Sequence, residues 1–166
     1  KATVIKGDLP GHIFHGNQYQ SGNTAEVGRT AEALGQTAIK DAASIARELD
    51  DAYWKAADED VASDEDGNLH FDRTGTTSSS WYRPVPEAVS HYEELWDKHN
   101  DLCKEAYKQL STASDAYALM SHHAQKAGDS EMADTYANRA GELSKMAEPY
   151  KDGSKEPTIN IYDTHY

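Results

Sequence analysis

Apolar side chains between residues 89 and 124 recur at intervals that alternate strictly between three and four residues. The positions are Val89, Tyr92, Trp96, His99, Cys103, Ala106, Leu110, Ala113, Tyr117, Met120 and Ala124. This alternation is typical of a long α-helix that packs lengthwise against other helices. At 1.5 Å per residue, a helix of about forty residues is about 60 Å long. The sequence therefore predicts a thin, elongated core rather than a thick globule.

Two further segments show the same helical periodicity. The first begins near Thr24, a plausible helix cap, and has the apolar positions Val27, Ala31, Leu34, Ala38, Ala42, Ile45, Leu49, Ala52 and Ala56. The other carries Ala133, Tyr136, Ala140, Leu143 and Ala147. Gly128 is expected to end the long helix, and Asp129 or Ser130 to cap the next one. Pro149 is expected to stop that helix near Glu148.

We therefore predict a mainly α fold, an elongated antiparallel three-helix bundle with extended N- and C-terminal arms. A long helical hairpin and a shorter third helix form residues 24–149, interrupted by a long loop at about 62–85. Residues 1–23 form the N-terminal arm and residues 150–166 an extended tail. A short hairpin around Asp66 and Gly67 is expected within the loop. The tail alternates like a strand and has to pair with the loop hairpin or with another chain.

The formal net charge of −13 excludes several classes of partner. Phosphate backbones and anionic membrane surfaces repel such a chain, so we expect no direct nucleic-acid or membrane binding. A basic protein surface is a better match. Cys103 is the one cysteine, so no intrachain disulfide can form. This composition favours a reducing cytosol, or a particle assembled in one.

No combination of residues in the sequence points to catalysis, a cofactor or a metal. His12 and His15 lack a third ligand at a recognised spacing. The acidic stretch of residues 64–72 fails the calcium-loop pattern, because its sixth residue is Leu69 rather than glycine. Cys103 lies within the helical seam, where a buried thiol is expected. We therefore predict no enzymatic activity and no cofactor.

Aromatic residues outside the helical stripes are candidate contacts with a partner. Trp81 and Tyr82 lie in the long loop, and Tyr162 lies in the tail beside Ile159 and Ile161. Tyrosine and tryptophan bring a large apolar area with one polar group, which suits interfaces. Strand addition to a neighbouring chain is one way in which such a tail docks.

The N-terminal arm contains the stretch GHIFHGNQY, which combines glycine, histidine, aromatic and amide residues. The glycines permit close approach, the aromatic rings can fill pockets, and the amides can pair with a partner backbone. Two interpretations stay open: the arm docks to a partner, or it caps its own bundle. The stretch resembles a motif, G-H-x-F-x-G-N-Q-[YW], of virion-associated proteins of tailed bacteriophages. The matching residues are Gly11, His12, Phe14, Gly16, Asn17, Gln18 and Tyr19.

This resemblance implies a setting in the virion rather than an activity, and His15 stands where arginine is common in the motif. We expect a phage structural protein, a minor head or decoration component, assembled in the host cytoplasm. Its partners would be other virion proteins such as the major capsid protein, in a homo- or hetero-oligomeric assembly. The alternative is an acidic inhibitor of a host defence or nucleic-acid enzyme that acts by charge mimicry. The sequence begins with Lys1 rather than methionine. The initiator methionine is normally removed only before a small residue, and lysine is not small. We therefore also expect either proteolytic processing or an incomplete sequence.

Overall fold

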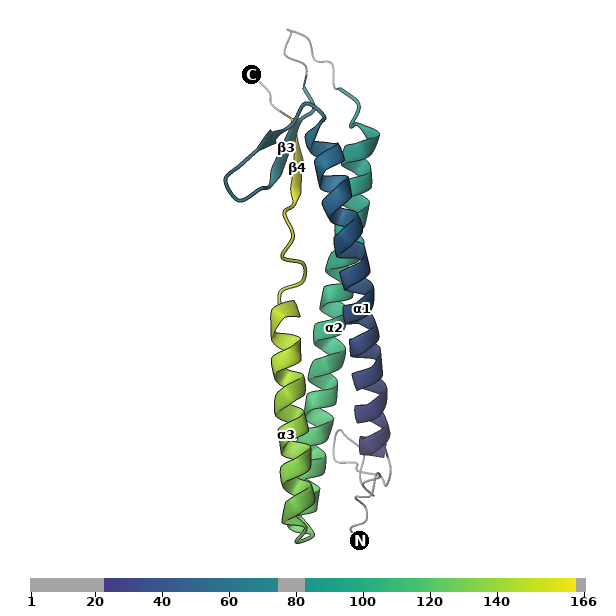
Figure 1. Cartoon of the computed structure of the whole chain (residues 1–166), viewed down its shortest axis with the longest axis vertical. Helices are drawn as coiled ribbons and strands as arrows, with labels where there is room; N and C mark the ends of the chain where they lie inside the picture. The colour runs from purple at the N-terminus through teal and green to yellow at the C-terminus, as the bar shows by residue number, and fades with distance from the viewer. Residues whose placement is uncertain (1–22, 75–82, 164–166) are drawn as a thin grey trace. The chain divides into compact units, whose positions relative to one another are not determined.

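The computed structural model describes residues 23–74 and 83–163, and most of these residues are helical (Figure 1). The helices are α1 (Asn23–Ala57), α2 (Glu87–Lys126), α3 (Ser130–Ala147) and the short 3-10 helix η1 (Glu148–Tyr150). The strands are β2 (Ala62–Ser63), β3 (Leu69–Asp72) and β4 (Ile159–Tyr162). The mainly α prediction is confirmed. The predicted N-terminal arm, except its last residue, lies outside the described residues.

The chain divides into two compact units, and each is described by itself. Unit 1 comprises Lys1–Lys40 and Cys103–Asp152, and unit 2 comprises Asp41–Leu102 and Gly153–Tyr166. The first half of α1 and the second half of α2 therefore belong to unit 1, together with α3 and η1. The remaining halves of α1 and α2 belong to unit 2, together with the three strands.

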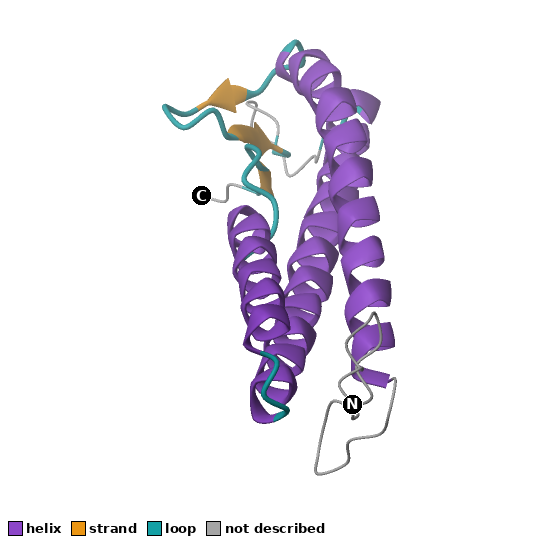
Figure 2. Ribbon diagram, turned by 60° about the horizontal axis from the view of Figure 1, so that its bottom comes forward, coloured by secondary structure: helices purple, strands orange, loops and turns teal. Residues whose placement is uncertain are grey.

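The helical segments of unit 1 alternate in direction. At one end Ala25 packs with Met120 and Ala133, and further along Ala31 packs with Ala113 and Leu143. Residue numbers rise along α1 and α3 while they fall along α2, so α2 is antiparallel to both. Figure 2 shows α3 beside α2 after the short turn that connects them.

The turn between α2 and α3 forms as the sequence predicts. Gly128 has a φ of +84°, a left-handed conformation that glycine adopts without steric cost. Asp129 is the N-cap of α3, and its side chain accepts a hydrogen bond from the backbone N–H of Met132 at 3.1 Å. This bond pairs one of the backbone donors that the first turn of a helix leaves free.

One position of the predicted apolar stripe is wrong. Leu34 is 48% exposed, whereas Gly35 beside it is buried and faces Leu110 of α2. With Gly28 and Gly35 included, the buried positions of α1 keep a strict three–four alternation through Ala31, Ala38 and Ala42. The glycines lie in the seam because they allow the helix backbones to approach closely.

The core of unit 2 joins two helical segments and a sheet. Buried side chains of α1 and α2, among them Leu49 and Tyr92, pack with Leu69 of β3. The sheet has the order β2-β3-β4, in which β2 is antiparallel and β4 parallel to β3. The predicted loop at 62–85 is therefore partly ordered structure, with a hairpin at the expected Asp66-Gly67 turn.

Candidate functional site

The structure describes three of the residues predicted to contact a partner. Ile159 and Ile161 are half-buried and pack against the core of unit 2, whereas Tyr162 is 41% exposed. Residues 11–19, which carry Gly11, His12, Phe14, Gly16, Asn17, Gln18 and Tyr19, lie outside the described residues. The same holds for Trp81 and Tyr82. Within the described part of the tail, Tyr162 is thus the large apolar side chain that is exposed to solvent.

The tail finds its strand partner within the chain. Leu69 is paired with Ile159, and Phe71 is paired with Ile161, in a parallel register. Because side chains alternate along a strand, this register turns both isoleucines toward the helices and Tyr162 away from them. Of the two pairings that the sequence left open, the structure has the one with the loop hairpin.

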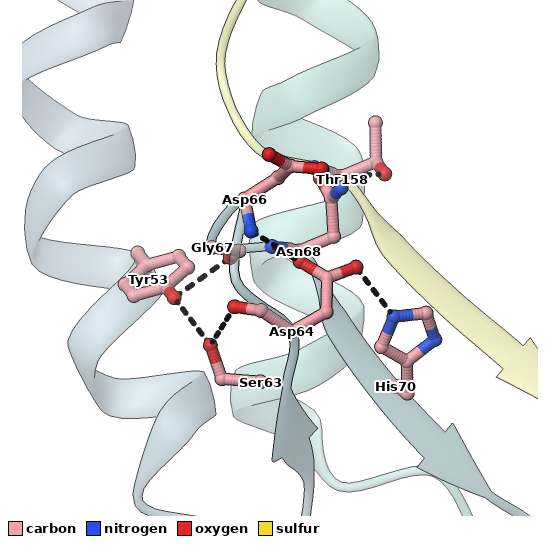
Figure 3. A network of polar contacts seen from close by, with 8 residues as sticks. All are labelled: Tyr53, Ser63, Asp64, Asp66, Gly67, Asn68, His70 and Thr158. Atoms are coloured by element: carbon pink, nitrogen blue, oxygen red, sulfur yellow. Dashed lines mark hydrogen bonds and ion pairs between the residues drawn. The ribbon is translucent and has the colours of Figure 1, made fainter.

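A carboxylate organises the hairpin turn that receives the tail (Figure 3). One oxygen of Asp64 accepts hydrogen bonds from the backbone N–H groups of Asp66 and Asn68, both at 2.9 Å. The other oxygen lies 3.0 Å from Nε2 of His70. The contact with His70, aided by the backbone bonds, holds the pKa of Asp64 below its ordinary value. The carboxylate of Asp64 therefore stabilises the turn that connects β2 and β3.

The same turn connects the helices to the tail. Gly67 has a φ of +84°, and its carbonyl accepts a hydrogen bond of 2.7 Å from the hydroxyl of Tyr53 on α1. The side-chain oxygen of Asn68 accepts a bond of 2.8 Å from the backbone N–H of Thr158. The turn thus fixes the entry of β4 next to β3.

Residues 154–157 are anchored on α2 by polar contacts. Nδ1 of His99 lies 2.7 Å from the hydroxyl of Ser154. The backbone N–H of Ser154 donates a hydrogen bond of 2.9 Å to the side-chain oxygen of Asn100. The indole N–H of Trp96 donates to the carbonyl of Glu156 at 3.0 Å, and the Tyr92 hydroxyl donates to that of Pro157. His99 is therefore a buried, hydrogen-bonded side chain: it is 7% exposed, and burial lowers its pKa.

Arg83 fixes the chain immediately after Trp81 and Tyr82. Its guanidinium donates to the carbonyl of Asp72 from two nitrogens, at 2.9 and 2.6 Å, and to Asp60 at 3.0 Å. It also lies over the ring of Phe71, 4.5 Å from the ring centre. The two predicted contact aromatics therefore directly precede a firmly held residue.

The negative charge is distributed very unequally between the units. Unit 2 contains 18 acidic and 6 basic residues, a net charge of −12, and unit 1 contains 11 and 10, a net charge of −1. The total charge alone predicts no such partition. Because attraction to a charged partner depends on local charge, any basic partner is drawn mainly to unit 2.

Sequence reasoning missed one prominent side chain, Trp54. It is 64% exposed on α1, the largest exposed fraction among the big apolar side chains described. Trp54 lies outside the apolar stripe of its helix, between Ala52 and Ala56, and this was the available signal. On an amphipathic helix, a tryptophan outside the apolar stripe is expected on the solvent side.

In residues 23–74 and 83–163, no group of three or more histidine, cysteine or acidic residues is placed to hold a metal ion. Cys103 is buried, as expected. None of the described helices combines the length and apolar character that crossing a membrane requires.

Comparison of the chain with protein-family models, with curated proteins and with solved structures finds no match.

Proposed function

We propose that the chain is a non-enzymatic structural protein of a phage virion, a minor head or decoration component. The observation that carries this proposal is the motif of residues 11–19, which resembles that of virion-associated proteins. The arm binds neighbouring subunits through Phe14 and Tyr19, and the tail presents Tyr162 as a second contact. The partners are other virion proteins such as the major capsid protein.

The proposal extends to the architecture. The two units continue one another as a single elongated three-helix bundle, and residues 1–22 form an arm that extends from it. The unbroken run of α1 and α2 through both units supports this arrangement. Small-angle X-ray scattering of the full chain tests it, since a long rod and a compact pair of units give different maximum dimensions.

Binding to particles tests the function. The full chain is mixed with purified phage particles that lack it, and the particles are recovered by sedimentation. We expect the wild-type chain to sediment with them and the double variant Phe14→Ala/Tyr19→Ala to stay in solution. Leu34→Ala, which removes an exposed apolar side chain from α1, is the matched control and should still sediment. Absence of the wild-type chain from the particle fraction would contradict the proposal.

Charge mimicry of nucleic acid is the second candidate, and it requires carboxylates spaced along a row like the phosphates of a strand. Glu87, Glu94 and Asp101 are exposed on α2 and follow one another at seven-residue intervals. At 1.5 Å per residue they are about 10 Å apart, against an axial rise of about 3.4 Å per phosphate along a DNA strand. This mismatch favours the structural role. An inhibitor would instead show tight, salt-sensitive binding to a DNA-processing enzyme.

A further inference from the structure

One exposed aromatic side chain lies at the end of α1 in unit 2. The indole of Trp54 is supported on one side by Tyr53, whose ring meets it edge to face at 5.1 Å between centres. Tyr53 is itself held by its hydrogen bond to Gly67 and by a ring contact with Tyr92. Trp54 is therefore a large apolar side chain that packs against a well-anchored tyrosine and is 64% exposed to solvent.

Carboxylates lie next to this indole along the chain. Asp50 and Asp51 precede Trp54 by one turn of α1. Asp58 is the first residue after α1, and its N–H still donates to the carbonyl of Trp54 at 3.1 Å, so all four side chains share one face. We name these four residues the Trp54 face. All of them are exposed, and within the described part of the chain no salt bridge or side-chain hydrogen bond joins the three carboxylates to another residue.

We propose that the Trp54 face binds an arginine-rich segment of a partner protein. A guanidinium is planar, so it can stack on the indole while it donates paired hydrogen bonds to the neighbouring carboxylates. The ammonium of lysine is not planar, so it is less suited to stack on the indole and to donate paired hydrogen bonds to carboxylates at the same time. The net charge of −12 on unit 2 draws a basic segment to this surface and repels phosphates.

This inference is independent of the virion proposal. It concerns α1 of unit 2, whereas the proposed virion contacts are the N-terminal arm and Tyr162. A basic partner segment can bind the Trp54 face whether or not the chain enters a particle.

Titration of the full chain with a dye-labelled nona-arginine peptide tests the inference. We expect saturable binding, followed by fluorescence anisotropy, that weakens by about threefold to tenfold in Trp54→Ala, the range given by a partly exposed cation–π contact. The triple variant Asp50→Asn/Asp51→Asn/Asp58→Asn should weaken binding by at least about tenfold. Nona-lysine should bind the wild-type chain more weakly than nona-arginine.

The control triple Glu87→Gln/Glu94→Gln/Asp101→Asn removes the same charge from unit 2 at exposed positions of α2. It should weaken binding by no more than about threefold, the effect of general attraction alone. Circular dichroism checks that each variant keeps its helices. Equal losses in the two triple variants, or unchanged binding in Trp54→Ala, would overturn the proposal, as would no binding of nona-arginine at all.

Discussion

Gly35 lies so close to Leu110 that any side chain at position 35 would collide with the leucine. A methyl group on Gly35 would lie 2.7 Å from both Cγ and Cδ2 of Leu110. These are atoms of a fully buried side chain, which has little room to move. The contact sets how near α1 comes to α2 in unit 1.

Substitution of Gly35 by alanine should therefore destabilise the protein. Overpacking of a filled core costs about 1–3 kcal/mol, which exceeds the gain of up to about 1 kcal/mol that alanine brings in a helix interior. Chemical denaturation followed by circular dichroism measures the change in the free energy of unfolding.

Gly141→Ala is the matched control for this substitution. Gly141 lies inside α3, and a methyl group there meets no atom within 4 Å. This variant should be neutral or more stable by up to about 1 kcal/mol. If both variants gained stability, the close approach at Gly35 would be disproved.

Loss of the N-cap of α3 should cost about 1 kcal/mol. Asp129→Ala removes the carboxylate that accepts a hydrogen bond from the backbone N–H of Met132. Thermal unfolding measures the loss. Asp134→Ala, at an exposed position within the same helix, controls for the loss of an acidic side chain.

Acidification should weaken unit 2 through His99. Burial lowers the pKa of His99 from 6.5, although Glu156 acts in the opposite direction. Between its folded and unfolded pKa values the unfolded chain binds more protons, so stability falls as the pH falls below about 6.5. His99→Gln keeps hydrogen-bonding groups but does not titrate. Its stability relative to wild type should therefore improve between pH 7 and pH 5.

Denaturant titrations at several pH values measure this difference. His122→Gln, at an exposed position of α2, controls for the loss of a histidine. A difference between wild type and His99→Gln that stayed constant with pH would show that burial leaves the pKa of His99 unchanged.

Removal of the Asn68 amide should loosen β4. Asn68→Ala deletes the acceptor for both the N–H and the hydroxyl of Thr158. Faster hydrogen exchange is expected at the amides of Ile159–Tyr162, with no change in α3. Asn160→Ala, on the exposed side of the same strand, serves as the comparison. Unchanged exchange in β4 would contradict a role for Asn68 in holding the strand.

The helices were predictable because their signals are local. Periodicity identified α1 and α2. Gly128 indicated the end of α2, Asp129 the start of α3 and Pro149 the end of α3. The prediction of a buried Leu34 was wrong because periodicity is read from apolar side chains. Gly35 has no side chain, so the pattern does not show that its backbone is the part that packs against α2.

The sheet was predictable only in outline. Asp66-Gly67 indicated the hairpin, and the alternation at Ile159 and Ile161 indicated a strand. The choice of partner depends on a contact between Asn68 and Thr158, which are 90 residues apart. No local pattern encodes such a pairing. The partition of charge was hidden for the same reason, because unit 2 is assembled from two separate stretches of sequence.

The place of β4 in the chain has a consequence for a shortened form of the protein. Every described helix precedes β4 in the sequence, and β4 is the strand that completes the sheet. A chain cut after residue 152 would therefore keep all the described elements of unit 1 but leave β3 without β4. The free edge of β3 would then be open to pairing with another chain.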